Sequence, residues 1–351
     1  MTTFLDDDAL AGVVDLAELI DTVRTLHIDL ALGHADQPVP ALIDSAPSTL
    51  LLPMVATSRR LGLTVVKVLT DAQDNMPADA PVQQSTIVLL DATTGNRLAV
   101  MAGSTCTRMR TAATSAAATD ALARTDSRVL GLVGAGPLAV EHIAAIRKVR
   151  PIDTVVVWSR TPERIRSFRH ALGQRDALDR TAPLDLVVAP DARGVVETAD
   201  ILCTLTPARD PVIHGDWFHP GLHVNAVGAP PRPDHREIDS TGMARATVVV
   251  DSTAVQLRKS GEVLLALPEG ATTEQHFRRE LGDVLAGLAT GRATAGEITL
   301  FNSVGLALQD LAFAALATGQ IGRAGAREAP PDYRDRQPAL PLATTAPVTG
   351  N

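Results

Sequence analysis

The segment Arg128–Thr161 reads as a strand, a glycine turn, a helix and a second strand in one continuous unit. The first strand is the apolar run Val129–Val133, and the turn after it, Gly134-Ala135-Gly136-Pro137-Leu138-Ala139, has the spacing GxGxxA. In such a turn the first glycine permits a tight bend, the second lets the backbone approach a pyrophosphate, and the alanine allows close helix packing. Unpaired N–H groups at the helix N-terminus attract the anion. The unit therefore predicts a dinucleotide-binding fold of the Rossmann type.

The end of the second strand indicates which dinucleotide binds. An NAD-preferring fold places Asp or Glu here to hold the ribose 2′-hydroxyl, whereas this chain reads Ser159-Arg160-Thr161 after Thr154–Trp158. An arginine fork and two hydroxyls suit a 2′-phosphate, and Arg164 offers a second contact one helical turn further on. The sequence thus favours NADP(H). The alternative is that Arg160 is a solvated loop residue and Thr161 only caps the next helix.

Composition is typical of a cytoplasmic enzyme with two lobes. The chain has 351 residues, of which 45% are hydrophobic, and carries a net charge of −8. An acidic chain is a poor partner for nucleic acid, and no apolar run approaches the roughly 18 residues of a membrane span. The two cysteines form neither a disulfide framework nor a metal-ligand pattern.

The fold class predicted is α/β, a doubly wound sheet beside an α+β lobe. In the first part of the chain, residues 9–33 show helical periodicity and Leu61–Leu69 is an apolar run. Ser85–Leu90 and Arg97–Met101 resemble a hairpin, and Arg110–Arg124 is an alanine-rich helix leading into the glycine-turn unit. These elements form the α+β lobe.

Later strands alternate with helices or loops, as a doubly wound sheet requires. A short helix is expected near Glu280–Leu288, and Phe301–Ala317 is expected to be helical and to return to the first lobe. The predicted domains are residues 1–124 with 305–326 for substrate binding and dimerisation, 125–304 for the dinucleotide, and a disordered, proline-rich tail at 327–351. The later strands expected are Leu184–Val188, Ile201–Thr204, Leu222–Val227 and Thr247–Asp251.

Two basic residues are candidates for chemistry. Lys67 is one of only three lysines and lies inside the apolar run LGLTVVKVL, where a buried ammonium needs a carboxylate, a polar cleft or a sheet edge to reach. Arg110 lies at the expected mouth of the alanine-rich helix, where a guanidinium can fix a substrate carboxylate. The alternatives are a snorkelling lysine and a helix-start arginine paired to a surface acid.

Several segments together resemble the ornithine cyclodeaminase and mu-crystallin family. They are RTAATSAAATDALA, LGLVGAGPLAVEHI, VVVWSRT, ADILCTLTPARDPVIHGDWFHPGLHVNAVGA, RPDHREID, SGEVLL and LFNSVGLALQDLA, and the likeness spans roughly residues 10 to 322. The resemblance implies a homodimer in which a substrate lobe lies beside a Rossmann lobe. It also implies interconversion of amino and imino acids with a nicotinamide cofactor.

Carried over to this chain, the resemblance makes Lys67 the substrate lysine and Arg110 the carboxylate-binding arginine. Besides the glycine turn and residues 159–161, it places the cofactor near Val227, Gly228, Thr204 and Thr206, with Ser303 a weaker candidate because its hydroxyl could simply satisfy a buried backbone group.

Two departures from the family pattern concern the substrate. Family members have an arginine two residues after the proline of a QPxR segment, and here Pro40 stands in its place. Losing one charge-assisted hydrogen bond weakens a simple α-amino acid by roughly ten- to a hundredfold unless Arg59, Arg60 or Arg108 substitutes. The aspartate that follows Gly228 in ornithine cyclodeaminases is also missing, which disfavours ornithine cyclisation.

Three functions remain open on the sequence. The first is an NADPH-dependent reductase of a 2-imino acid or cyclic ketimine, or the same enzyme run backwards as an amino acid dehydrogenase. The second is a cyclodeaminase or C–N exchange lyase that makes a nonproteinogenic amino acid and recycles its nicotinamide. The third is a non-enzymatic NADP-dependent binding protein, against which the intact Lys67 and Arg110 argue.

Overall fold

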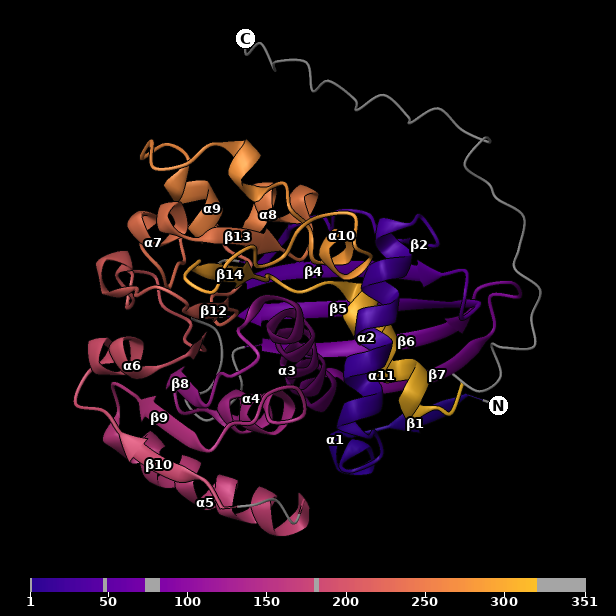
Figure 1. Ribbon diagram of the computed structural model, residues 1–351. Coiled ribbons are helices and arrows are strands. Elements are labelled where there is room, and N and C mark those ends of the chain that lie inside the picture. The colour runs from indigo at the N-terminus through magenta and orange to yellow at the C-terminus, as the bar shows by residue number, and fades with distance from the viewer. Residues whose placement is uncertain (1, 47–48, 73–82, 180–182, 321–351) are drawn as a thin grey trace.

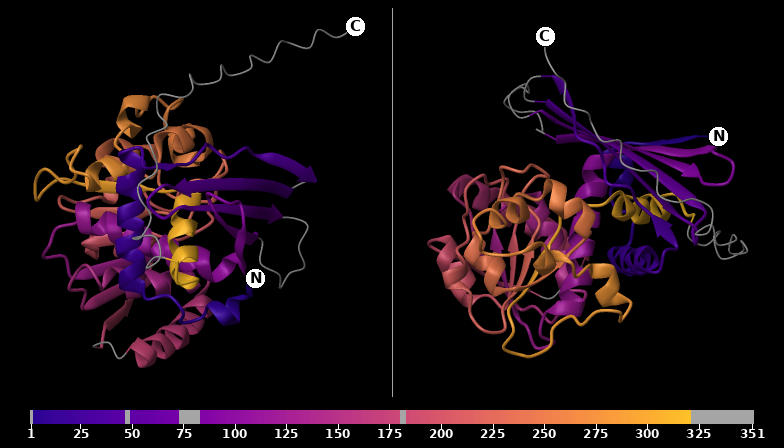
Figure 2. Two further views of the ribbon diagram at one scale, coloured as in Figure 1. Left: turned by 90° about the vertical axis from the view of Figure 1, so that its right-hand side faces the viewer. Right: turned by 90° about the horizontal axis from the view of Figure 1, so that it is seen from above.

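The computed structural model describes residues 2–46, 49–72, 83–179 and 183–320. These residues form two lobes, each built on one sheet, and helix α3 (Gly103–Leu122) lies between them (Figures 1 and 2). The predicted α/β class is confirmed. The proposed tail at 327–351, like residues 321–326, lies outside the described residues.

The first sheet has the order β1-β7-β6-β5-β4-β2, with β3 paired to β4. Its neighbours run antiparallel except for β1 and β7. The expected hairpin is confirmed as β6 and β7, and the apolar run around Lys67 is β5. Its strands are β1 (Thr3–Leu5), β2 (Ala35–Asp36), β3 (Ile43–Ala46), β4 (Thr49–Ser58), β5 (Leu63–Ala72), β6 (Gln83–Asp91) and β7 (Arg97–Ala102).

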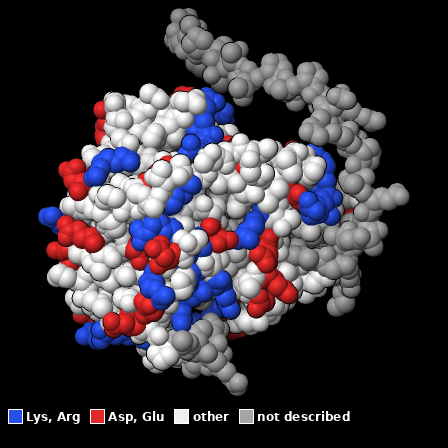
Figure 3. Space-filling model, viewed as in Figure 1, with Lys and Arg blue, Asp and Glu red and all other residues white. Residues whose placement is uncertain are grey.

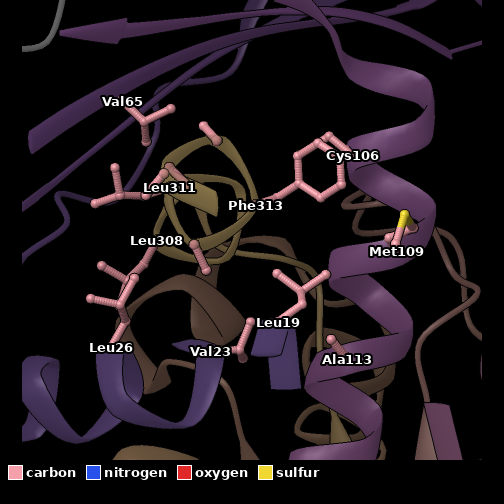
Figure 4. Packing of buried hydrophobic residues seen from close by; sticks show 14 of the residues in the cluster. Leu19, Val23, Leu26, Val65, Cys106, Met109, Ala113, Leu308, Leu311 and Phe313 are labelled. Atoms are coloured by element: carbon pink, nitrogen blue, oxygen red, sulfur yellow. The ribbon is translucent and has the colours of Figure 1, made fainter. Parts of the chain in front are cut away.

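Helices from both ends of the described chain pack on one face of this sheet. Helix α2 (Leu16–Ala31) begins at the Asp15 cap, whose carboxylate accepts from the N–H groups of Ala17 and Glu18. Helix α11 (Ala307–Ala317) lies between α2, α3 and the sheet (Figure 4). The apolar side chains of these elements form one buried cluster, shown in Figure 4 by Leu19, Val23, Leu26, Val65, Cys106, Met109, Ala113, Leu308, Leu311 and Phe313.

The second sheet is entirely parallel and has the order β10-β9-β8-β11-β12-β14-β13. The strand order reverses between β8 and β11, where a doubly wound sheet binds its ligand. The four later strands expected from the sequence are confirmed, three of them with slightly different ends. The strands are β8 (Val129–Val133), β9 (Thr154–Trp158), β10 (Asp185–Val188), β11 (Ile201–Thr204), β12 (His223–Ala226), β13 (Thr247–Val250) and β14 (Thr299–Asn302).

Two expected helices have different limits. The alanine-rich helix begins at Gly103 instead of Arg110, so Arg110 lies two turns inside it. The segment expected to be helical from Phe301 begins instead as strand β14, and its helix α11 begins only at Ala307. Phe301 belongs to a strand because β14 pairs on both sides, with β12 and β13, and every residue in it is buried. A short apolar run does not distinguish such a strand from a helix.

The remaining helices are short, apart from α4 and α5. They are α1 (Asp7–Leu10), α4 (Pro137–Ile146), α5 (Pro162–Asp179), α6 (Ala192–Thr198), η1 (Gly215–Trp217), α7 (Ser240–Arg245), α8 (Thr253–Lys259), α9 (Gly261–Ala266), η2 (Glu274–Phe277) and α10 (Leu281–Leu285). Among the described residues no helix is both long and apolar enough to cross a membrane.

Candidate active site

Lys67 lies in the middle of strand β5 and is only 1% exposed. Alternation along the strand puts it on the same face as Val65, which points toward α11 (Figure 4). Its Nζ donates to Thr107 Oγ1 at 2.8 Å and to Asp310 Oδ1 at 3.0 Å. An ammonium has three donors, so one N–H remains for a further acceptor.

Arg110 meets Lys67 through the same acid. Its Nε lies 3.3 Å from Asp310 Oδ1, and its Nη1 donates to Gln309 Oε1 at 2.5 Å. Because α3 begins seven residues earlier than expected, the first-turn N–H groups of that helix do not surround Arg110; its partners belong to α11 instead. Neither alternative holds: Lys67 does not snorkel to an edge, and Arg110 does not pair with a surface acid.

Asp310 is the residue of this cluster that the sequence reasoning missed. It is fully buried, and it is the single charged residue in the apolar helix α11, which is the signal that could have identified it. Two cations and one anion leave a formal charge of +1 in a site almost closed to water. A buried cationic excess is costly unless an anion balances it. The cluster is therefore suited to one small carboxylate.

Neutral groups surround this charged cluster. Burial lowers the pKa of His27 to about 4, so its imidazole is uncharged beside Gln309. Burial, reinforced by Asp310, raises the pKa of the Cys106 thiol well above its ordinary value. Neither group alters the charge balance near pH 7.

The chain between β14 and α11 closes over Arg110. Gly305 has a φ of +85°, and a Cβ there would lie 2.9 Å from both Nη atoms of Arg110, so no side chain fits. Asp251 Oδ2 holds this turn by accepting from Ser303 Oγ and from the N–H groups of Val304 and Gly305. The Ser303 hydroxyl, predicted to lie at the cofactor, thus bonds to Asp251, in line with the alternative reading that it only satisfies a buried group.

The glycine turn has the geometry expected for an anion cradle. Gly134 N–H donates to Trp158 O at 2.9 Å, which joins the turn to β9. Gly136 is the N-cap of α4, and no side chain caps that helix. A Cβ built on Gly136 would meet nothing within 4 Å, whereas Ala139 is fully buried. The turn therefore leaves open space and uncapped N–H groups where a pyrophosphate would lie, and these residues fit the dinucleotide.

The residues after β9 lie at the surface beside that turn. Arg160, Thr161 and Arg164 are exposed, and Thr161 N–H bonds to Ser159 Oγ at 3.4 Å. Neither arginine side chain forms an ion pair with a described residue. Glu163 is the acid nearest to them in the sequence, and its Oε1 lies 3.4 Å from Arg166 Nη2. Arg160 and Arg164 are thus available to an anionic ligand.

A buried carboxylate, Glu237, joins the ends of two central strands. It accepts from Thr204 Oγ1, from both the N–H and Oγ1 of Thr206, and from Gly228 N–H, at 2.6–2.8 Å. Gly228 packs so closely that a Cβ would lie 2.2 Å from Thr206 N. The polar groups of Thr204, Thr206 and Gly228 are therefore committed to Glu237, and they shape the expected cofactor site through this carboxylate. Val227 follows β12, is partly buried, and packs against an apolar cluster that includes Ala118 and Phe301.

The pKa of Glu237 is raised to about 7, mainly by burial and also by the charge of Glu262, while hydrogen bonds from Thr204 and Thr206 act in the opposite direction. The sequence reasoning also missed Glu237. The glutamate of the segment HREID is visible in the sequence. Its hydrogen-bond partners, however, lie up to 33 residues away, so the spacing of residues along the chain does not identify them.

The three arginines named as possible substitutes for the arginine missing at Pro40 all bond to neighbouring groups. Arg59 bonds to Asp36 at 2.5 Å and to Gly33 O. Arg60 forms a bidentate pair with Asp29 at 2.6 and 2.7 Å, and Arg108 bonds to Ser104 and Thr105 on its own helix. Each of these three side chains therefore already has local structural partners.

The surface carries both signs of charge. On the face drawn in Figure 3, Lys and Arg side chains are interspersed with Asp and Glu. In the part of the chain that the structure describes, no group of three or more His, Cys, Asp or Glu residues could hold a metal ion.

Comparison with known proteins places this site in context. Residues 4–322 match the model of the Ornithine cyclodeaminase/mu-crystallin family. Ketimine reductase mu-crystallin from Mus musculus is 35% identical over 285 residues, which cover 81% of this chain and 85% of the relative.

Two solved structures are similar over nearly their whole length. Thermococcus litoralis Delta(1)-pyrroline-2-carboxylate reductase, in complex with NADH and L-proline, has a TM-score of 0.85 at 32% identity and covers 92% of this chain and 98% of its own. An archaeal alanine dehydrogenase dimer with bound NAD has a TM-score of 0.82 at 27% identity, over 93% and 98% of the two chains. The family resemblance predicted from the sequence is confirmed.

Proposed function

Because the chain belongs to the ornithine cyclodeaminase/mu-crystallin family, we propose that it is a nicotinamide-dependent reductase of small 2-imino carboxylates, including cyclic ketimines. Run backwards, the same reaction makes it an amino acid dehydrogenase. The observation that carries the proposal is the buried cluster of Lys67, Arg110 and Asp310, with one positive charge in excess. Its carboxylate-binding chemistry matches the substrate class named for the relatives, and it lies in the lobe that packs against the dinucleotide sheet.

The cluster divides the chemistry between its two cations. The Arg110 guanidinium pairs with the substrate carboxylate, while its Nε and Nη1 edges remain held by Asp310 and Gln309. The free N–H of Lys67 faces the imine nitrogen and donates the proton that this nitrogen gains on reduction. The bound nicotinamide supplies the hydride that goes to the imine carbon. Asp310 and Thr107 fix the Lys67 ammonium so that donor and substrate meet in one geometry.

The preferred cofactor in this proposal is NADP(H). Its support is the segment Ser159-Arg160-Thr161 with Arg164, in which Ser159 is half-buried, the other three residues are exposed, and no carboxylate opposes a 2′-phosphate. We expect Arg160→Ala to weaken NADPH binding about ten- to a hundredfold, the value of one charge-assisted hydrogen bond, with little effect on NADH. Arg166→Ala is the matched control, because Arg166 is an exposed arginine on the helix that follows Arg160 and already lies near Glu163. Equal losses of both cofactors in fluorescence titrations would contradict the preference.

The protein acts as a homodimer in this proposal. The face of the first sheet opposite α11 carries apolar side chains, of which Val55 and Val68 are 36% and 38% exposed. Apolar patches of this kind mark protein interfaces. The similar archaeal alanine dehydrogenase is a dimer, and a second copy of this chain is the occupant that we propose for the face.

The reaction is tested by the absorbance of the reduced cofactor. We expect steady NADPH oxidation with pyrroline-2-carboxylate or piperideine-2-carboxylate, and loss of it in Lys67→Met and Arg110→Met. Lys148→Met is the matched control, since Lys148 is an exposed lysine beyond α4. Product formation without net change in absorbance would instead support a lyase that recycles its cofactor. Full activity of either site variant would refute the assigned roles.

A further inference from the structure

An ion pair between the lobes lies outside the cluster that holds the substrate carboxylate. Arg232 belongs to the loop after Gly228, and its Nε donates to Asp71 Oδ2 at 3.0 Å. Asp71 is on β5, four residues beyond Lys67, and alternation places both side chains on the same face of the strand. The pair thus joins the loop that follows β12 of the dinucleotide sheet to the strand that carries Lys67.

The pair is shielded from solvent and incompletely bonded. The side chains of Arg232 and Asp71 are 14% and 8% exposed. Among the residues that the structure describes, Arg232 Nη2 and Asp71 Oδ1 are both buried without a hydrogen-bond partner, although Gln83 Nε2 donates to the other Asp71 oxygen at 3.4 Å. A buried polar atom left unsatisfied destabilises a protein, so one free donor and one free acceptor on the same ion pair point to a bound group that completes them.

The charge of the pair restricts what that group can be. Arg232 and Asp71 neutralise one another, unlike the cluster at Lys67. A second carboxylate would be repelled by Asp71, and an ammonium would be repelled by Arg232. A neutral group that both donates and accepts, such as a carboxamide or a hydroxyl, satisfies both atoms without introducing charge.

The position of the pair indicates which part of a substrate it meets. Asp71 is four residues along the strand from Lys67, so their Cα atoms are about 13 Å apart along β5. In a substrate held by its carboxylate and nitrogen at Arg110 and Lys67, the end of the side chain is the part that can extend along β5 toward the pair. We propose that Arg232 and Asp71 are specificity-determining residues that select 2-imino or 2-amino acids whose side chain ends in a carboxamide or hydroxyl. This inference rests on the proposed function and extends it.

The test compares amino acids with the same five-carbon backbone in the dehydrogenase direction with NADP+. Norvaline is apolar at its end, glutamine and 5-hydroxynorvaline are neutral and polar, glutamate is anionic and ornithine is cationic. Two hydrogen bonds predict that kcat/KM for glutamine or 5-hydroxynorvaline exceeds that for norvaline by about five- to a hundredfold. A preference for glutamate or ornithine, or equal rates with norvaline, overturns the proposal.

Variants then assign the preference to the pair. We expect Arg232→Met to lower kcat/KM for glutamine to the value for norvaline, while kcat/KM for norvaline changes by less than about twofold. Asp71→Asn leaves the arginine charge unbalanced, so kcat/KM for glutamate should rise relative to kcat/KM for glutamine. Arg236→Met is the matched control, because this arginine follows in the same loop but pairs with Glu269 at 3.0 Å. Equal loss with every substrate in Arg232→Met would show a purely structural role and overturn the proposal.

This inference and the proposed function fail differently. If no imino acid drives NADPH oxidation by the wild-type protein, the proposed function is wrong. If pyrroline-2-carboxylate is reduced but the five-carbon series shows no preference for the neutral polar members, only the role of Arg232 and Asp71 is wrong.

Discussion

Replacing Glu237 by Gln isolates what one buried carboxylate contributes to stability. Burial raises its pKa to about 7 from an ordinary value of 4.5. The folded protein therefore holds this proton more tightly than the unfolded chain does. The folded state loses stability as the pH rises from about 4.5, where the unfolded chain ionises, to about 7, and the loss is constant above that. The difference between these two pKa values corresponds to about 3 kcal/mol of stability.

The side chain of Gln does not ionise, so the Glu237→Gln variant lacks this pH-dependent loss of stability. It has a different, constant defect, because its single amide oxygen replaces two acceptor oxygens that serve Thr204, Thr206 and Gly228. Its NH2 group must face at least one donor, which costs about 1–3 kcal/mol at every pH. The variant is consequently less stable than wild type near pH 5, and the difference shrinks or reverses by pH 8.5.

Thermal unfolding without cofactor, followed from pH 5 to pH 8.5, measures this effect. Roughly a quarter of the loss has already occurred at pH 5, so at about 2–4 °C per kcal/mol the Tm difference between wild type and Glu237→Gln should change by roughly 5–10 °C over this range. Glu269→Gln serves as a control, because hydrogen bonds from Arg236 lower the pKa of that exposed carboxyl instead of raising it. A Tm difference between wild type and Glu237→Gln that stays constant with pH would refute the reasoning.

Three further predictions concern the substrate lobe. Asp310→Asn leaves two buried cations without their anion, and we expect about 3–5 kcal/mol of destabilisation, seen as a lower Tm; an unchanged Tm would contradict the buried pairing. Lys67→Met keeps a neutral Arg110–Asp310 pair, so we expect kcat/KM to fall about 10²–10⁴-fold with NADPH affinity preserved, and a parallel loss of cofactor binding would point to misfolding instead. Val68→Glu puts a charge on the apolar outer face of the first sheet, and light scattering should find a monomer for this variant and the proposed dimer for the wild type; a dimeric variant would place the interface elsewhere.

Much of the nucleotide lobe could be predicted because its signals are local. The GxGxxA turn, the apolar runs on either side and the helix between them lie within Arg128–Thr161, and β8, α4 and β9 follow them closely. The apolar periodicity that defines each element is contained in the element itself. Lys67 and Arg110 also stood out, the first as a rare lysine in an apolar strand and the second as an arginine at the expected mouth of the alanine-rich helix, and the family resemblance supported both.

What only the tertiary structure decided is how distant residues pair. Asp310 meets Lys67 across 243 positions of sequence, and Arg232 meets Asp71 across 161. Strand β14 was mistaken for helix because its burial comes from β12 and β13 on either side, and the start of α3 moved Arg110 from a helix mouth to a buried ion pair. Sequence spacing records periodicity along one element, whereas the charge balance of a buried site depends on which elements the fold brings into contact.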